Sequence, residues 1–103
     1  MAIKLVVLYP QPISEVAFEQ RYHGQHLPLM ARALGSSERT RTYKVRSTLG
    51  GPSFYRMAEV QFASVDELGA FGRSALGLEA RHSAESVSTG GRPVTLICEE
   101  DGS

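Results

Sequence analysis

The order of strand-like and helix-like segments is the feature that most limits how this chain of 103 residues can fold. Four short segments are rich in β-branched and aromatic residues and are bounded by proline, glycine or polar clusters, as β-strands are. They span residues 3–9, 39–48, 54–62 and 93–99. Residues 16–34 and 64–87 instead repeat apolar side chains at helical spacing. The order β-α-β-β-α-β predicts an α+β protein with a ferredoxin-like, four-stranded antiparallel sheet that carries its helices on one face.

Local signals predict where the helical regions begin and break. Ser14 can cap the first region, and Pro28 lies within it. Because proline has no amide hydrogen and its ring crowds the preceding turn, we expect a kink between residues 24 and 27. Gly77 should divide the second region into helices of residues 64–75 and 78–87. The whole chain, residues 1–103, has the size of one domain, and its tail from about residue 100 should fray.

The first and last strands are apolar on both faces. In the first strand Leu5 and Val7 point one way while Val6 and Leu8 point the other. One layer of helices buries only one face of a sheet, and an exposed apolar face costs a small domain several kcal/mol at roughly 25 cal/mol per Å². We therefore expect a homodimer joined through the open sheet face, with a dimeric α/β barrel as the result.

Charge and cysteine content narrow the possible partners and location. The chain has 11 basic and 11 acidic residues, so its net charge is zero and gives no general attraction to nucleic acid or to a membrane surface. The apolar run at residues 1–9 is too short for a signal peptide or a membrane span. Cys98 is the only cysteine, which excludes an internal disulfide. We expect a cytoplasmic protein that binds neither nucleic acid nor membranes, and no glycine-rich phosphate loop indicates a nucleotide cofactor.

A row of aromatic and histidine side chains carries the candidate chemistry. Phe18, Tyr22 and His26 are four residues apart and lie on one helix face, which Leu29 continues toward the core. An imidazole with a pKa near neutrality can act as an acid or base, so His26 is the predicted catalytic residue and Tyr22 the predicted donor to a developing negative charge. Phe18 and Leu29 would line the substrate pocket. The alternative is a buried histidine satisfied by a backbone carbonyl, beside an ordinary core tyrosine.

Three further residues are candidates for substrate binding. Tyr9, at the end of the first strand, can reach the same pocket, and Glu59 lies between apolar neighbours where a carboxylate needs a partner. His23 lies at the flank of the helix. The pair His23 and His26 has a spacing that can share a metal, but no third ligand falls nearby, so we expect no metal site.

The residues at the end of the first strand, in the first helix and in the third strand together resemble the EthD family. Those that carry the resemblance are Leu8-Tyr9-Pro10, Phe18, Tyr22, His26-Leu27-Pro28-Leu29, residues 54–59, Phe62 and Thr89-Gly90-Gly91. The resemblance spans nearly the whole chain. It departs from the family pattern in the segment from Arg81-His82 to Ser88, which is more polar than expected.

The resemblance implies dimeric α/β barrels of ferredoxin-like subunits, each with a pocket between sheet and helices. Members are often labelled reductases without a defined reaction. The implied function is therefore a small enzyme without a cofactor, an oxidoreductase or an isomerase or cyclase, that acts on an apolar or aromatic oxygenated metabolite. Two alternatives stay open: a non-catalytic carrier that uses the same pocket, and a structural dimerisation module that needs none.

Overall fold

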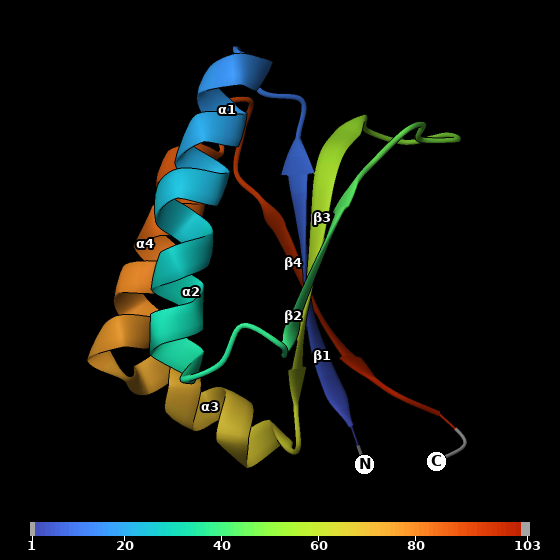
Figure 1. Cartoon of the computed structure of the whole chain (residues 1–103). Coiled ribbons are helices and arrows are strands. Elements are labelled where there is room, and N and C mark those ends of the chain that lie inside the picture. The colour runs from blue at the N-terminus through green and yellow to red at the C-terminus, as the bar shows by residue number, and fades with distance from the viewer. Residues whose placement is uncertain (1, 102–103) are drawn as a thin grey trace.

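One antiparallel sheet carries the helices on a single face, as predicted, in a computed structural model that describes residues 2–101 (Figure 1). The strand order is β2-β3-β1-β4. The strands are β1 (Ile3–Pro10), β2 (Thr40–Lys44), β3 (Phe54–Phe62) and β4 (Val94–Glu99). The helical elements are α1 (Glu15–Arg21), the π-helical turn η1 (Tyr22–His26), α2 (Leu27–Leu34), α3 (Val65–Arg73) and α4 (Ala75–Val87). The ferredoxin-like prediction is confirmed, and none of the helices within residues 2–101 has the length and apolar character needed to cross a membrane.

The predicted interruption of the first helical region is a π-helical turn. Ser14 caps α1 by accepting a hydrogen bond from the Ala17 amide at 3.2 Å. Because Pro28 has no amide hydrogen, the carbonyl of Gly24 cannot receive an α-helical bond from it. The amide of Leu27 instead bonds to the carbonyl of Tyr22, five residues earlier. The helical path therefore stays continuous from α1 to α2 through one widened turn.

The second helical region breaks at Ser74, so the predicted break at Gly77 is wrong. Ser74 has an extended backbone, and its hydroxyl donates to the carbonyl of Phe71 at 2.7 Å while accepting from the amide of Gly77 at 2.9 Å. Gly77 lies in the first turn of α4, where an added Cβ would sit 1.8 Å from the carbonyl oxygen of Phe71. The glycine is required for this close approach of α3 and α4, not for a chain break.

The hairpin of β2 and β3 is shorter than predicted on its first strand. Regular pairing ends at Lys44. Beyond it, the amide of Val45 still donates to the carbonyl of Tyr55 at 2.9 Å, and the amide of Phe54 donates to the side chain of Thr48 at 3.2 Å. The loop between β2 and β3, residues 45–53, projects beyond the sheet (Figure 1). At the other end of the sheet, Glu100 donates a backbone hydrogen bond to Ala2 at 3.0 Å. The tail predicted to fray begins at about residue 100, and its last two residues, 102–103, lie outside the described residues.

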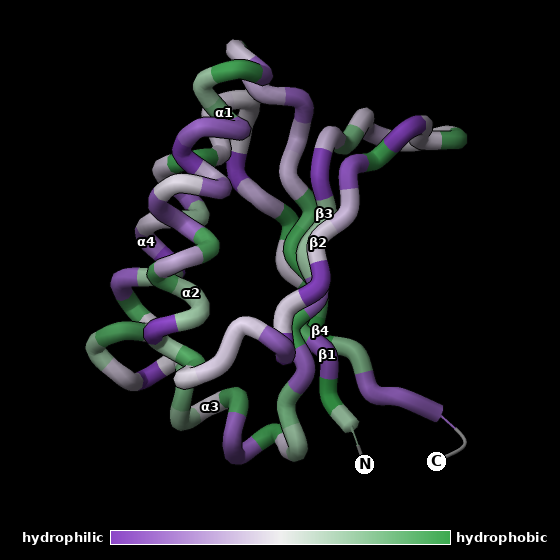
Figure 2. The backbone as a smooth tube through the Cα atoms, in the orientation of Figure 1, coloured by the Kyte–Doolittle hydropathy of each residue, from purple (hydrophilic) through white to green (hydrophobic). Residues whose placement is uncertain are grey.

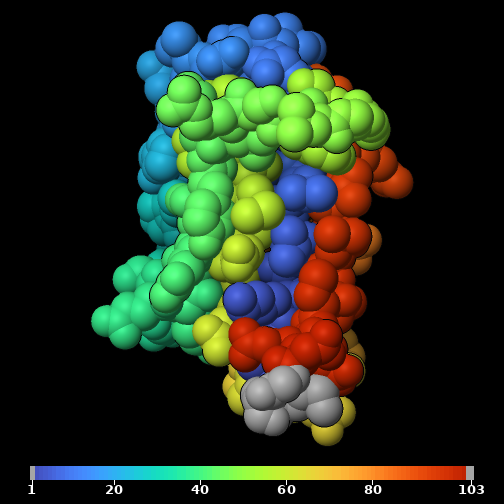
Figure 3. Space-filling model, turned by 90° about the vertical axis from the view of Figure 1, so that its right-hand side faces the viewer, coloured from blue at the N-terminus to red at the C-terminus, as the bar shows by residue number. Residues whose placement is uncertain are grey.

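The register of the strands divides their side chains between two faces. Residues that face the helices pair across β3, β1 and β4 as Val60-Leu5-Ile97 and Ala58-Val7-Thr95. The outer face carries Glu59-Val6-Leu96 and Met57-Leu8-Val94. Figure 3 views this outer face, with the four strands side by side and the loop of residues 45–53 across one end. The expectation that β1 and β4 present apolar residues on both faces is confirmed.

Two hydrophobic clusters join the helices to the inner face of the sheet. The aliphatic cluster contains Ile3, Met30, Val60, Phe62 and Ala80. The aromatic cluster contains Tyr9, Phe18, Tyr22, Tyr55 and Val87. The apolar stretches of the strands that supply them stand out in Figure 2 as green segments where the strands cross. The helix layer is thus attached to the sheet through two separate groups of buried side chains.

Replacement of Gly77 tests the close approach of α3 and α4. We expect Gly77→Ala to lower the free energy of unfolding by about 2 kcal/mol or more, because its Cβ would collide with a backbone carbonyl. Urea denaturation measures the change. Gly72→Ala is the matched control, since Gly72 is also helical and has open space at its Cβ, so the same change there should be neutral or slightly stabilising. Equal effects at both sites would contradict the packing described.

Candidate functional site

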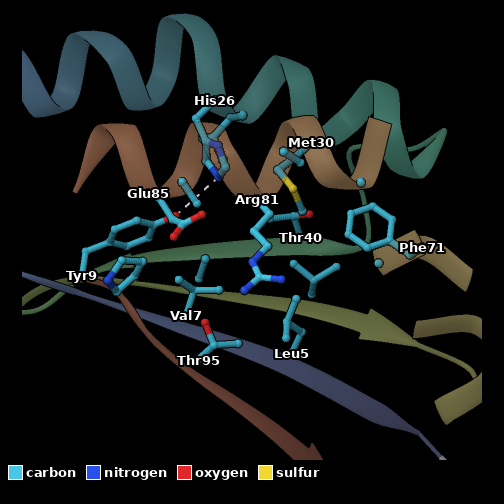
Figure 4. Close-up of a pocket in the computed structure, with 18 of the residues that line it drawn as sticks. Leu5, Val7, Tyr9, His26, Met30, Thr40, Phe71, Arg81, Glu85 and Thr95 are labelled. Atoms are coloured by element: carbon cyan, nitrogen blue, oxygen red, sulfur yellow. Dashed lines mark hydrogen bonds between the residues drawn. The ribbon is translucent and has the colours of Figure 1, made fainter. Parts of the chain in front are cut away.

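A cavity of about 470 Å³ lies between the helix layer and the inner face of the sheet (Figure 4). Its floor is formed by Leu5 and Val7 of β1, and residues of η1, α2 and α4 cover it. Ile97 of β4 also lines the cavity and yet is 65% exposed. The cavity therefore opens to solvent beside β4, and a small molecule can enter there.

His26 borders this cavity from η1 and is only 5% exposed. Its Nε2 atom lies 3.4 Å from the hydroxyl oxygen of Tyr9, the contact drawn as a dashed line in Figure 4. Its Nδ1 atom lies 3.0 Å from the hydroxyl oxygen of Ser83 on α4. Each ring nitrogen therefore has one hydroxyl partner, and the shorter contact holds the ring from the helix side. The alternative in which a backbone carbonyl satisfies the imidazole does not apply, since both contacts are to side chains.

Burial controls the protonation of His26. Removal from water disfavours the charged imidazolium and lowers the pKa of His26 to about 4. The side chain is therefore neutral at physiological pH and keeps one ring nitrogen without a proton. A neutral imidazole that borders an accessible cavity is able to accept a proton from a bound molecule.

The predicted row on the first helical region is present as a stack of rings. Phe18 and Tyr22 are stacked with centroids 5.3 Å apart, and Tyr22 and His26 follow at 5.5 Å. Tyr22 is fully buried, and within residues 2–101 its hydroxyl has no hydrogen-bond partner. Burial also raises the pKa of Tyr22 to about 12, so the hydroxyl keeps its proton. Tyr22 and His26 line the cavity, whereas Phe18 supports them from within the aromatic cluster.

An ion pair between the buried Arg56 and the part-exposed Glu19 lies next to Tyr22. Arg56 is 6% exposed, its guanidinium lies 5.0 Å from the centre of the Tyr22 ring, and its Nη2 atom donates to Glu19 at 2.6 Å. The Nε atom of Arg56 also donates to Glu19 at 3.2 Å, and the Tyr55 hydroxyl donates to it at 3.0 Å. Partial burial raises the pKa of Glu19, but the hydrogen bonds from Arg56 and Tyr55 outweigh it and hold that pKa below its ordinary value. Glu19 thus neutralises Arg56, and the pair fixes the ring of Tyr22.

Glu59, predicted to bind substrate, is not at the cavity. It lies on the outer face of β3, opposite Val6, because side chains alternate along a strand and its neighbours Ala58 and Val60 point inward. Its partner is Lys4, at 3.7 Å on the same outer face. The apolar neighbours of Glu59 in the sequence therefore face the opposite side of the sheet and do not bury its carboxylate in the core.

The other predicted binding residues are divided between the cavity and its surroundings. Tyr9 lines the cavity and is 1% exposed. Leu29 packs against the aliphatic cluster and, like Phe18, does not line the cavity. His23 points away from the cavity, with 52% of its side chain exposed, and pairs with Glu19 at 3.2 Å. His23 and His26 therefore do not share a site, and among residues 2–101 no three His, Cys, Asp or Glu side chains are placed to hold a metal ion.

Helix α4 supplies cavity residues that the sequence analysis did not select. Ser83 contacts His26, and Arg81 and Glu85 line the cavity one helical turn apart. All three belong to the polar segment of residues 81–88. Arg81 and Glu85 are four residues apart and share one helix face, which is the signal that could have placed both near the pocket, whereas Ser83 has no such signal.

A sequence model of the EthD domain matches residues 10–85. The fold is also similar to several crystal structures. An ethyl tert-butyl ether D (EthD) family protein from Bacillus halodurans C-125 is 27% identical with a TM-score of 0.84, covering 97% of this chain and 99% of that one. An EthD-like protein from Ralstonia eutropha JMP134 is 24% identical with a TM-score of 0.67, covering 95% and 90%. A dimeric ferredoxin-like protein of unknown function from Jannaschia sp. CCS1 is 12% identical with a TM-score of 0.74, covering 97% and 100%. None of the curated proteins compared with the chain matches it.

The burial of His26 predicts an acid-dependent loss of stability. Its pKa is 6.5 in the unfolded chain and about 4 in the fold, so the unfolded chain binds more protons between these pH values. The free energy of unfolding should therefore fall as the pH drops from about 6.5 to about 4, by up to roughly 3 kcal/mol from this group. In urea denaturation across this pH range, the free energy of unfolding of His26→Gln should depend less steeply on pH than that of the wild type. The exposed His82 provides the control, and His82→Gln should keep the wild-type slope.

Proposed function

Because this chain belongs to the EthD family, we propose that it is a small enzyme that moves a proton on an apolar, oxygenated metabolite bound in the cavity between helices and sheet. The observation that carries the proposal is the neutral imidazole of His26 beside an accessible, largely apolar hollow. A core histidine that serves packing alone needs no cavity next to it. The floor of Leu5 and Val7 favours a ligand with an apolar or aromatic body.

His26 acts as the general base in this proposal. With its hydrogen on Nδ1, the ring donates to Ser83, and Nε2 has a lone pair available toward the cavity. The contact from Nε2 to the Tyr9 hydroxyl is long at 3.4 Å, so an acidic hydrogen of the substrate can replace it. Nε2 takes a proton from a carbon or oxygen next to a substrate carbonyl, and the resulting imidazolium returns it at another position of the same molecule.

Tyr22 and Tyr9 are the proposed hydrogen-bond donors. When the proton leaves, negative charge develops on the substrate oxygen and needs a donor. Burial raises the pKa of both hydroxyls, so both stay protonated and able to donate. The free hydroxyl of Tyr22 gives up no existing partner when it binds the substrate oxygen. The same step would serve an isomerisation or a cyclisation, and the family label keeps oxidoreduction as the alternative reaction class.

Hydrogen exchange on a simple ketone tests the proposed base. In D2O, we expect the wild-type protein to accelerate the exchange of the acidic C–H hydrogens of 2-tetralone for deuterium. Proton NMR measures the rate of this exchange. His26→Gln should reduce that acceleration by roughly 100-fold or more, the usual contribution of a general base. His82→Gln, at an exposed position, should leave it unchanged. Equal rates for wild type and His26→Gln would contradict the proposal.

The second candidate function is a carrier that binds such a molecule without changing it. The apolar cavity favours this function as much as catalysis, whereas the neutral base and the free Tyr22 hydroxyl favour catalysis. Binding of 2-tetralone, detected by line broadening in the same samples, without exchange above the buffer rate would support the carrier. A cytoplasmic location and a single domain over residues 1–103 stay predictions.

We also infer that two copies of the chain associate through the outer face of the sheet. Met57, Leu8 and Val94 lie side by side there, and Val94 and Leu96 are 41% and 44% exposed. Helices cover only the inner face, so a second copy is the simplest means of burying this apolar surface (Figure 3). Two of the similar structures, including the one from Jannaschia, are described as dimeric.

A charge on the outer face should separate the two copies. We expect Leu96→Asp to convert a dimer into a folded monomer, because a carboxylate cannot be buried there without a partner. Size-exclusion chromatography with light scattering gives the mass, and circular dichroism verifies the fold. Val65 on α3 is 63% exposed in the helix layer, so Val65→Asp should remain dimeric. A wild-type protein that is monomeric at high micromolar concentration would overturn the inference.

A further inference from the structure

Arg81 carries a positive charge into the cavity without a partner. We infer that Arg81 anchors an anionic group of the ligand, a carboxylate or a phenolate, and that the natural ligand is therefore an apolar organic monoanion. This inference rests on the proposed function, because it assigns the chemical class of the molecule bound in the same cavity.

The placement of Arg81 supports an anchoring role. The side chain extends from α4 across the cavity toward Leu5 and Val7 of β1 (Figure 4). Within residues 2–101, Arg81 forms neither a hydrogen bond nor an ion pair. Its guanidinium thus faces an apolar floor, and solvent takes the place of a protein acceptor. An anionic oxygen pair matches the fork of donors on arginine, which binds carboxylates through two parallel hydrogen bonds.

The neighbouring charges do not neutralise Arg81. Glu85 is four residues further along α4, at the spacing where a helical ion pair would form. Its carboxylate lies 4.0 Å from Arg92 instead. Arg56, the other buried arginine of the inner face, is already neutralised by Glu19. Arg92 also lines the cavity, but its side chain is 93% exposed and is paired with Glu85. Among the described residues that line the cavity, Arg81 is therefore the unpaired cation.

The charge of the ligand follows from the same set of residues. Glu85 also lines the cavity, and a second negative charge on the ligand would be repelled by its carboxylate. A single free arginine beside one carboxylate favours a monoanion over a phosphate dianion. Arg81 is largely exposed, so solvent screens the attraction and the gain in affinity is moderate.

Two buried hydroxyls indicate that the ligand carries a further polar group. The hydroxyls of Tyr22 and Thr40 both line the cavity, and both are buried without a hydrogen-bond partner within residues 2–101. Buried polar atoms are ordinarily hydrogen-bonded, so each marks a position where a ligand oxygen would fit. An acid held by Arg81 would then present its second oxygen function near Tyr22 and His26, where the proposed proton transfer occurs.

A matched pair of probes tests the anchor. 2-Naphthoate and 2-naphthalenemethanol share a bicyclic apolar body and differ in charge, and isothermal titration calorimetry gives the Kd of each. We expect the wild-type protein to bind 2-naphthoate roughly tenfold more tightly than the alcohol, as one partly screened charge-assisted contact provides. Arg81→Gln should remove this preference by weakening 2-naphthoate only, and Arg81→Lys should keep part of it. The exposed Arg32 on α2 does not line the cavity, so Arg32→Gln should retain the full preference.

The outcomes separate this inference from the proposed function. Equal binding of both probes by wild type, or an undiminished preference in Arg81→Gln, would overturn the anionic anchor while leaving a binding cavity in place. Binding of neither probe would overturn both. A preference lost equally in Arg32→Gln would show a general charge effect and would also overturn the anchor at Arg81.

Discussion

The helices are held against the sheet by two separate hydrophobic clusters, and the cavity depends on this separation. Residues of both clusters line it, with Tyr9 and Tyr22 from the aromatic cluster and Met30 and Val60 from the aliphatic one. Each cluster consists of buried side chains from both the helices and the sheet, so the two clusters set the distance between these layers on both sides of the hollow. The hollow can therefore persist without a ligand, although an empty apolar space is unfavourable for the fold by itself.

The electrostatics of the site follow from which charges are neutralised inside the fold. The Glu19–Arg56 pair brings a buried cation close to Tyr22 without leaving a net charge there. His26 has no such partner, so burial keeps it neutral. Arg81 on α4 remains the free cation of the described cavity lining. The cavity thus combines a neutral base, protonated hydroxyls and one anchor of positive charge, which is the combination that the proposed chemistry needs.

The sequence allowed the order of strands and helices along the chain, the one-sided helix layer and the aromatic row to be predicted, because these follow from local periodicity and from short capping and turn signals. The row of Phe18, Tyr22 and His26 is a clear case, since a spacing of four residues determines a shared face. The misplaced helix break has a non-local cause. The break at Ser74 depends on a contact between α3 and α4 that no local pattern reveals, and Gly77 was assigned to a break when it serves that contact.

Partners that are far apart in the chain were beyond the sequence analysis. Ser83 meets His26 across 57 positions, and Arg56 meets Glu19 across 37. Neither pairing has a signature in spacing, because each depends on how α4 and β3 are placed relative to the first helical region. The outward position of Glu59 was available from strand alternation, once the inward residues of β3 were known.

The widened turn η1 has a consequence for how this chain can vary over evolution. A π-helical turn holds one residue more than an α-helical turn, and the loss of one residue from it would restore a regular helix. Because the extra residue is held within about one turn, the side chains before and after it would keep their orientation about the helix axis. Tyr22 and Met30 would both keep their places. A homologue that lacks one residue in this turn should therefore need few compensating substitutions in α2, and alignments of such proteins should place a single-residue gap here.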